Sequence, residues 1–349
     1  MTTTETRVAR LAALLDEPLL VTSGVNVRWL TGLASSNAAV LVEPDGEATL
    51  YTDFRYARKA AKLDIRLEQT ARAVVSDLAT RLAGRTIWVE SHVLTVAALE
   101  TLRDGGVDAQ PRQGLVERLR AVKDDGEVAI LREAAAISDR VFEALAEERF
   151  VGTTEVDLAW RIRELFHEHG SSEASFDAMV AAGDNGSSPH SDNRDVPIEP
   201  NTLVIVDAGC RVDGYASDCT RTFATGDLPD ELASIYETCQ RAQLAALEAM
   251  GPGVAGRDAD AVARDLIAEA GYGERFGHGL GHGIGLEVHE APVARPESTD
   301  VLEAGNVISC EPGIYLPGVA GVRIEDMVLI TDAGRERLTQ AGKDLVVVG

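Results

Sequence analysis

Residues 202–225, TLVIVDAGCRVDGYASDCTRTFAT, predict a β-hairpin around which the rest of the chain is organised. The first arm, TLVIVDA, is a β-branched apolar run of strand length, and the second arm is richer in Tyr, Thr and Phe. A turn centred between Val212 and Asp213 would set Asp207 directly opposite Asp218. Opposed residues on a hairpin have Cβ atoms ~5 Å apart, and like charges there are destabilising. Two carboxylates at that spacing need a shared proton or cations between them.

A second hairpin repeats this arrangement. Residues 307–311 and 322–330 are both strand-like, and the turn-prone Pro317-Gly318 lies between them. A hairpin centred on Gly318 sets Glu311 opposite Glu325. Solvated edge charges explain most carboxylates, but not those embedded in apolar strands such as VIVDAG and VRIED. The two hairpins therefore predict four paired carboxylates with a role in binding.

The segment FGHGLGHGIGLEVHE lies between the hairpins and holds His278, His282 and His289. Its glycines allow the backbone to come close to a site, which argues against His282 as an ordinary core histidine. Four carboxylates and one imidazole favour Mn²⁺, Fe²⁺ or Co²⁺, with Zn²⁺ as a further candidate. We therefore predict a two-metal centre that activates water. Its candidate ligands are Asp207, Asp218, His282, Glu311 and Glu325.

Length and composition set the protein class. A chain of 349 residues accommodates two domains, and 45% hydrophobic with 26% charged residues is typical of a soluble globular protein. The net charge of −24 argues against nucleic-acid partners and against anionic membranes. No window approaches the ~20 apolar residues of a membrane span, and the N-terminal stretch has no apolar region typical of a signal peptide.

The cysteines indicate the compartment. Cys210, Cys219, Cys239 and Cys310 form no CxxC motif and no disulfide-rich pattern, so we expect a reducing cytoplasm. Three of them stand beside the carboxylates, which raises the alternative of thiolate ligands. Since neighbours along a strand point to opposite faces, Cys219 and Cys310 are better explained as buried small hydrophobic residues.

The order of elements predicts two parts. Residues 1–122 alternate short strands and helices, as in an α/β domain, and contain no catalytic constellation. Beyond Lys123, helices at about 125–148 and 154–170 precede the first hairpin, and helices at about 229–250 and 257–270 precede the second. The repeated helix-helix-hairpin order predicts two halves related by a pseudo-twofold, with the metals between them.

The motifs VDAG, SDCTRTF, HGLGHGIGLEVHE, EPGIY and VRIED, in this order, resemble those of the pita-bread metallopeptidases. Within them the chain resembles the proline-specific branch, aminopeptidase P and prolidase. The N-terminal NVRWLTGLASSNAAVLV and TDFRYARKA are similar to the creatinase-like domain of that branch. The resemblance implies an α/β (α+β) protein with a creatinase-like α/β domain at 1–122 and a pita-bread catalytic domain at 123–349.

The resemblance also implies roles for single residues. Asp207 would chelate one metal, Asp218 and Glu325 would bridge both, and His282 and Glu311 would complete the second. Glu311 would also move the proton of the attacking water, a hydroxide bridging the metals. The implied substrate-binding residues are His190, His278, His289, Tyr315 and Arg323, of which His190 and His289 are also expected to act in catalysis. For Arg323 the alternative is that it only pairs with the ligand carboxylates.

The implied activity is hydrolysis of the bond between an N-terminal residue and a following proline, with two divalent ions per chain, Mn²⁺ first. The short loop between Glu311 and Glu325 favours an Xaa-Pro dipeptidase, with an Xaa-Pro aminopeptidase as the alternative. A creatinase-like hydrolase or an inactive binding module of the same fold is a more distant one. SDNRDVPI after His190 departs from the family's usual glycine and Pro-Thr step. The expected partners are Xaa-Pro dipeptides or short peptides and a second copy in a homodimer.

Overall fold

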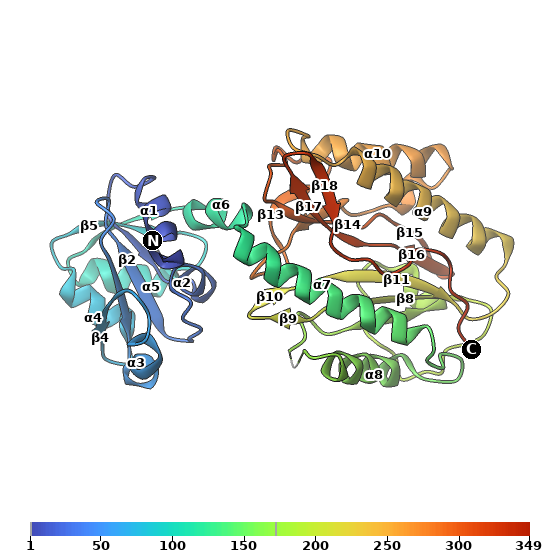
Figure 1. Ribbon diagram of the computed structural model, residues 1–349, viewed down its shortest axis with the longest axis horizontal. Helices are drawn as coiled ribbons and strands as arrows, with labels where there is room; N and C mark the ends of the chain where they lie inside the picture. The colour runs from blue at the N-terminus through green and yellow to red at the C-terminus, as the bar shows by residue number, and fades with distance from the viewer. Residues whose placement is uncertain (1, 172) are drawn as a thin grey trace. The chain divides into compact units, whose positions relative to one another are not determined.

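The computed structural model describes residues 2–171 and 173–349. The chain divides into two compact units, residues 1–120 and 121–349 (Figure 1). In the described part of the chain, no helix combines the length and the apolar content that crossing a membrane requires.

The N-terminal unit is built on a six-stranded mixed sheet with the order β4-β3-β2-β1-β5-β6. Strands β1, β2 and β3 pair antiparallel, and the outer pairs β3–β4, β1–β5 and β5–β6 are parallel. The strands are β1 (Leu19–Val21), β2 (Ala38–Val42), β3 (Ala48–Thr52), β4 (Arg66–Gln69), β5 (Thr86–Glu90) and β6 (Asp108–Arg112). The helices are α1 (Thr3–Ala12), α2 (Gly24–Thr31), α3 (Phe54–Ala60), α4 (Val74–Arg81), α5 (Val96–Asp104) and α6 (Leu115–Ala121).

Local sequence explains where these helices begin. The side chain of Ser23 accepts a hydrogen bond from the backbone of Asn26 at the start of α2. Asp53 does the same for α3, where its Oδ1 lies 2.8 Å from the backbone nitrogen of Arg55. These caps satisfy backbone donors that the first helical turn leaves unpaired. Apolar residues of the strands, such as Leu20, then pack with those of α4 in a buried cluster.

The C-terminal unit contains four long helices and several short sheets. The helices are α7 (Asp125–Leu145), α8 (Glu155–Glu168), α9 (Asp230–Ala249) and α10 (Gly256–Glu269), with short 3₁₀ helices at Gly183–Ser187 and Gly273–Arg275. One three-stranded sheet has the order β11-β8-β7, and one five-stranded sheet has the order β13-β12-β14-β17-β18. Two-stranded ladders, β9–β10 and β15–β16, extend the two hairpins. The strands are β7 (Met179–Ala182), β8 (Leu203–Ala208), β9 (Arg211–Val212), β10 (Tyr215–Ala216), β11 (Cys219–Ala224), β12 (Gly281–Gly283), β13 (Glu290–Ala294), β14 (Val307–Cys310), β15 (Gly313–Leu316), β16 (Ala320–Arg323), β17 (Asp326–Thr331) and β18 (Gly334–Arg337).

Each half of this unit has a hydrophobic cluster of its own. In the first, α7 and α8 pack on β7, β8 and β11 through side chains such as Phe142, Phe166 and Val206. In the second, α9 and α10 pack on β14, β16 and β17 through side chains such as Ile235 and Val328. Figure 1 shows α9 and α10 together along one side of the strands and α8 along the other. The predicted repetition of helix, helix and hairpin is present.

The register of the first hairpin differs from the prediction. Strand β11 pairs with β8 so that Asp207 lies opposite Thr220, and Asp218 is therefore diagonal to Asp207 rather than opposite it. The turn is centred between Asp213 and Gly214, one position later than expected, because both residues have positive φ values of 44° and 82°. A two-residue turn of this kind favours the Asp-Gly pair. The prediction of directly opposed aspartates was wrong by two positions.

The second hairpin has the predicted register. Cys310 lies opposite Asp326 and Gly313 opposite Arg323, on either side of Glu311 and Glu325. These pairs share the centre at Gly318, whose φ of 72° suits the turn. The expectation that Glu311 and Glu325 face each other is confirmed.

Candidate metal centre

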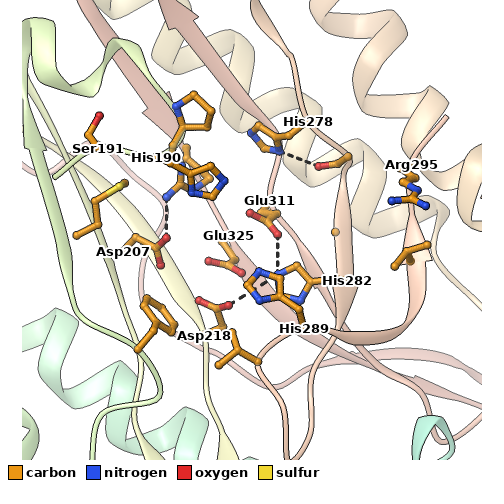
Figure 2. A pocket seen from close by; sticks show the side chains of 18 of the residues that line it. His190, Ser191, Asp207, Asp218, His278, His282, His289, Arg295, Glu311 and Glu325 are labelled. Atoms are coloured by element: carbon orange, nitrogen blue, oxygen red, sulfur yellow. Dashed lines mark hydrogen bonds and ion pairs between the residues drawn. The ribbon is translucent and has the colours of Figure 1, made fainter. Parts of the chain in front are cut away.

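The carboxylates of both hairpins converge on one cavity of about 780 Å³ (Figure 2). Strand β8 and the residue before β11 bring the aspartates, whereas β12 and the segments before β15 and β17 bring the histidine and the glutamates. The five candidate ligands line it: Asp207, Asp218, His282, Glu311 and Glu325. The same cavity is lined by four of the five residues expected at the substrate: His190, His278, His289 and Arg323.

Three of these groups form a tight cluster. One ligand atom each from Asp218, His282 and Glu325 lie within 4.8 Å of one another. His282 Nδ1 donates to the carbonyl oxygen of Gly283 at 3.2 Å, so its Nε2 faces the carboxylates. That Nε2 lies 3.1 Å from Glu311 Oε1 and 3.8 Å from Asp218 Oδ2. The imidazole is thereby oriented to offer a lone pair in its neutral form.

Two buried carboxylate oxygens without hydrogen-bond partners among the described residues indicate which ligand the site can bind. Asp207 Oδ2 accepts from Arg323 Nη2 at 2.6 Å, but Asp207 Oδ1 is buried with no partner among the described residues. Glu325 Oε2 accepts from Thr220 Oγ1 at 2.8 Å, and its Oε1 is likewise buried and unpartnered within residues 2–171 and 173–349. Leaving such acceptors unsatisfied is costly. The oxygen-rich donor set fits divalent cations, which would satisfy both atoms.

Without cations Asp218 and Glu325 resist ionisation. Burial raises the pKa of Asp218 well above its ordinary value, and the charges of Glu325 and Asp207 raise it further. Burial likewise raises the pKa of Glu325, with added repulsion from Glu311 and Asp207. A carboxylate desolvated beside like charges holds its proton. Divalent cations would remove this penalty and favour the ionised carboxylates.

Glu311 behaves differently because it is paired. Its burial favours the neutral acid, but the hydrogen bond and charge of His282 outweigh this and lower the pKa of Glu311 to about 2. Burial correspondingly disfavours the charged imidazole, yet the bond to Glu311 raises the pKa of His282. Ser309 Oγ donates to Glu311 Oε1 at 2.9 Å and accepts from the backbone nitrogen of His282 at 3.0 Å. This serine fixes both groups.

Arg323, Tyr315 and His278 form a chain along one wall. Arg323 Nη1 donates to the Tyr315 hydroxyl at 2.9 Å, and that hydroxyl donates to His278 Nε2 at 2.9 Å. His278 Nδ1 donates to the carbonyl of Gly279 at 2.8 Å, so both of its ring nitrogens are engaged. Burial lowers the pKa of His278 and raises that of Tyr315 to about 12. Tyr315 is buried behind the lining residues. Arg323 pairs with Asp207 but also lines the cavity, so its role at the substrate stays a prediction.

His190 and His289 reach the cavity from exposed positions. The ring of His289 lies against that of His282, with centroids 4.1 Å apart. Burial, followed by the charge of His282, lowers the pKa of His289. The neutral imidazole of His289 is therefore free to donate or accept at the cavity.

Sequence reasoning missed three residues at the site. Thr220 and Ser309 each lie two positions from a candidate ligand, on the same face of the strand, and each hydrogen-bonds a ligand carboxylate. The period of two could have identified them. Arg295 also lines the cavity, from the end of β13, and no sequence pattern marked it.

The four cysteines are buried and unpaired. Burial raises the pKa of the Cys219 and Cys310 thiols well above the ordinary range, which keeps them protonated. Neither lines the cavity. The expectation of buried small hydrophobic residues, rather than thiolate ligands, is confirmed for both.

Comparisons with known proteins agree with this geometry. Residues 129–332 match the model of metallopeptidase family M24, and residues 7–122 match that of the creatinase/prolidase N-terminal domain. A solved structure of an Xaa-Pro dipeptidase from Bacillus anthracis is 36% identical with a TM-score of 0.94, covering 99% of this chain and 100% of that one. The Xaa-Pro dipeptidase of Pyrococcus furiosus is 32% identical over 97% of this chain and 99% of its own. The X-Pro aminopeptidase structure from Thermotoga maritima MSB8 is 29% identical with a TM-score of 0.89, covering 97% of this chain and 100% of that one.

These matches confirm the predicted fold class and the predicted resemblance to the pita-bread metallopeptidases. They extend over both units and include the segments that carry the carboxylates and the histidines. The chain is therefore a metallopeptidase of family M24 with a creatinase/prolidase-type N-terminal domain.

Proposed function

We propose that this chain is a two-metal exopeptidase that releases an N-terminal residue from a following proline, with Xaa-Pro dipeptides as its main substrates. The observation that carries the proposal is the set of four carboxylates and one imidazole around unpartnered buried oxygens in a large cavity. The Xaa-Pro dipeptidases from Bacillus anthracis and Pyrococcus furiosus, to which the chain is similar, support it.

The ligands would be Asp207, Asp218, His282, Glu311 and Glu325. Bound divalent ions would polarise the scissile carbonyl and lower the pKa of a water molecule. Mn²⁺ is our first candidate, because oxygen donors outnumber the single nitrogen.

The chain's own residues would handle the proton and the developing charge. Glu311, ionised and fixed by Ser309, would accept the proton of the attacking water. As the water oxygen bonds to the carbonyl carbon and the C–N bond breaks, that proton would pass to the proline nitrogen. His289 and His190, which reach the cavity as side chains, would donate hydrogen bonds to the oxygen where negative charge develops.

The chemistry of proline explains why a dedicated cavity is needed. A prolyl peptide bond has no N–H, so a peptidase that binds its substrate as an added β-strand loses a ladder hydrogen bond there. A cavity that encloses the residue does not depend on that bond. This substrate class is consistent with a cavity of about 780 Å³ lined by His278 and Arg323.

Arg295 supports the preference for dipeptides. Figure 2 shows it on the side of His278 and His282 that faces away from Asp207. In the part of the chain that the structure describes, the Arg295 side chain has no carboxylate partner, although the cavity is otherwise rich in acids. A dipeptide presents its free carboxylate immediately after the proline, and a guanidinium binds such a group strongly. We infer that Arg295 receives it.

The alternative is an Xaa-Pro aminopeptidase acting on longer peptides, for which the Thermotoga maritima relative is a precedent. A creatinase-like hydrolase or an inactive binding module is less well supported, because the full ligand set lines the cavity.

Rates on Xaa-Pro, Xaa-Pro amide, Xaa-Pro-Yaa and Met-Ala-Ser with added Mn²⁺ test these readings. We expect the highest kcat/KM for Xaa-Pro and no turnover of Met-Ala-Ser. Arg295→Met should raise KM for Xaa-Pro by about tenfold or more, as expected for a lost charge-assisted bond, and leave the amide unaffected. Arg257→Met, on the exposed start of α10, is the matched control. Equal effects of Arg295→Met on acid and amide would exclude the carboxylate role, and a preference for Xaa-Pro-Yaa would favour the aminopeptidase.

The expected homodimer and cytoplasmic location stay predictions. Light scattering on the purified protein and cell fractionation can test them.

A further inference from the structure

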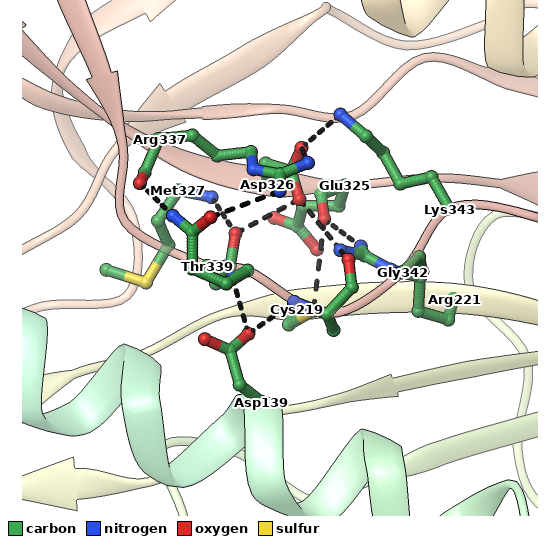
Figure 3. Close-up of polar contacts among 12 residues, drawn as sticks. Asp139, Cys219, Arg221, Glu325, Asp326, Met327, Arg337, Thr339, Gly342 and Lys343 are labelled. Carbon is green, nitrogen blue, oxygen red and sulfur yellow. Dashed lines mark hydrogen bonds and ion pairs between the residues drawn. The ribbon is translucent and has the colours of Figure 1, made fainter.

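A buried ion cluster lies next to Glu325, one of the candidate ligands (Figure 3). Its centre is Asp326, whose carboxylate is fully buried. Asp326 Oδ1 accepts from Arg221 Nη2 at 2.8 Å and from Thr339 Oγ1 at 3.1 Å. Asp326 Oδ2 accepts from Lys343 Nζ at 2.7 Å and from Gln243 Nε2 at 3.0 Å. None of these five residues lines the cavity.

Arg221 connects this cluster to the main chain on three sides. Its Nη1 donates to the carbonyl oxygen of Thr220 at 2.9 Å and to that of Glu325. Its Nε donates to the carbonyl of Gly342 and its Nη2 to that of Ala341, each at 2.8 Å. A planar guanidinium with fixed donor directions therefore determines where these four carbonyls lie.

Two of those carbonyls belong to different halves of the catalytic unit. Thr220 lies on β11 of the first hairpin, two positions after Asp218, whereas Glu325 directly precedes β17 of the second. The two segments also meet directly, since the Glu325 backbone nitrogen donates to the Thr220 carbonyl at 3.1 Å. Arg221 thus contacts both of the segments that carry Asp218 and Glu325 and adds to the direct hydrogen bond between them.

Stability alone is a weak reason for such a cluster. Arg221, Asp326 and Lys343 are all buried, and desolvating charges largely cancels the attraction between them. The cluster instead fixes the relative positions of three segments. The Arg221 side chain hydrogen-bonds the carbonyls of Thr220, Glu325 and Gly342 at once. The ligands next to this cluster are Asp218 and Glu325, the two carboxylates expected to contact both metals.

We propose that Arg221 is a positioning residue for the metal centre, held in place by Asp326 and Lys343. It sets the spacing between Asp218 and Glu325 at which two divalent ions bind together. The inference rests on the proposed two-metal function, and it assigns a role to residues 339–343, which supply none of the proposed ligands. The first ion can still bind to one half when this support is lost, whereas the second requires both halves in register.

Arg221→Lys tests the inference. Lysine retains the charge but cannot reach four carbonyls with one ammonium group. Purified full-length protein is stripped of metal, and Mn²⁺ binding is followed by titration calorimetry and by electron paramagnetic resonance. We expect the second Mn²⁺ to bind about 10–100-fold more weakly, as is typical when a partner of a ligand is removed, and the first to bind within about threefold of wild type. The exchange coupling between paired Mn²⁺ ions should fall together with the affinity for the second Mn²⁺.

The control is Arg132→Lys. Arg132 makes a bidentate ion pair with Glu336, at 3.0 and 2.6 Å, and is about half exposed. The same chemical change there should leave both Mn²⁺ affinities unaltered, although it disrupts a well-formed bidentate contact.

The outcomes separate this inference from the proposed function. If wild-type protein binds fewer than two Mn²⁺, the two-metal function fails. If it binds two and folded Arg221→Lys binds two with unchanged affinities and coupling, the positioning role is refuted. Should Arg221→Lys not fold, Lys343→Gln, which leaves the arginine in place, must weaken the second Mn²⁺ several-fold. Unchanged binding by that variant, or failure of both to fold, would assign the cluster to stability and overturn the inference.

Discussion

The metal-free protein should lose stability as pH rises, and Asp218→Asn should remove much of that loss. Burial and neighbouring charges raise the pKa values of Asp218 and Glu325 in the folded state, whereas carboxyls of the unfolded chain have pKa values of about 4. The folded protein therefore holds protons that the unfolded chain releases. Its free energy of unfolding falls as pH rises from about 4 through the folded pKa values, and is constant above them.

The geometry of the cluster sets the magnitude. The ligand atoms of Asp218 and Glu325 lie within 4.8 Å of each other. With an effective dielectric constant of about 20, two unit charges at that separation repel by about 3 kcal/mol. For a unit of this size, 1 kcal/mol shifts Tm by roughly 2–4 °C, so metal-free Asp218→Asn should melt about 6–12 °C above wild type at pH 9. Because the pKa values of both carboxyls are raised, wild type holds more protons at low pH, and the difference should shrink as pH falls toward 5.

The assay is thermal unfolding by circular dichroism between pH 5 and 9, after chelation and desalting, with residual metal measured. Asp332→Asn is the matched control, since Asp332 is an exposed carboxylate in the turn between β17 and β18 and the charge change is identical. A Tm difference between Asp218→Asn and wild type that does not depend on pH would refute the reasoning. So would an equal gain in the control.

Three other changes test the centre and the hairpin that carries it. Removal of the metals should abolish peptidase activity and Mn²⁺ or Co²⁺ should restore it; full turnover by protein shown to be metal-free would contradict the mechanism. His282→Ala should lower both metal content and rate, whereas His289→Ala should keep the metals and lower kcat by about 10²–10³, as for loss of one donor to an oxyanion. The reverse pattern in metal analysis and steady-state kinetics would exchange their roles. Gly209→Ala should destabilise the fold severely, because a Cβ there would overlap the carbonyl oxygen of Ser217; an unchanged Tm would show that the hairpin can open at this point.

The first hairpin shows how far sequence could predict the site. The turn was placed one position early, which moved the partner of Asp207 by two positions, from Thr220 to Asp218. Because side chains alternate between faces with a period of two, an error of two leaves every residue on its predicted face. The aspartates therefore converge on the cavity although they are not opposed. The Asp213-Gly214 pair, the favoured sequence of a two-residue turn, would have given the correct register.

Residues that act across the two halves were beyond such reasoning. Thr220 and Glu325 are 105 positions apart, and Arg221 and Asp326 likewise, and they meet only because two sheets pack together. Periodicity within a strand determines which face a residue occupies but not which strand lies against that face. Arg295 belongs to none of the motifs. Only the structure of the cavity shows that its side chain has no acidic partner among residues 2–171 and 173–349.

The support of Asp326 by Lys343 has a consequence for the order in which the protein matures. Lys343 is added to the growing chain 17 positions after Asp326, about 1–3 s later at ordinary rates of synthesis. All five proposed ligands are therefore synthesised before the segment that completes the cluster. Until then the nascent chain holds the carboxylate hairpins without their full support, so we expect the metal pair to load after synthesis of residues 339–343 rather than during it.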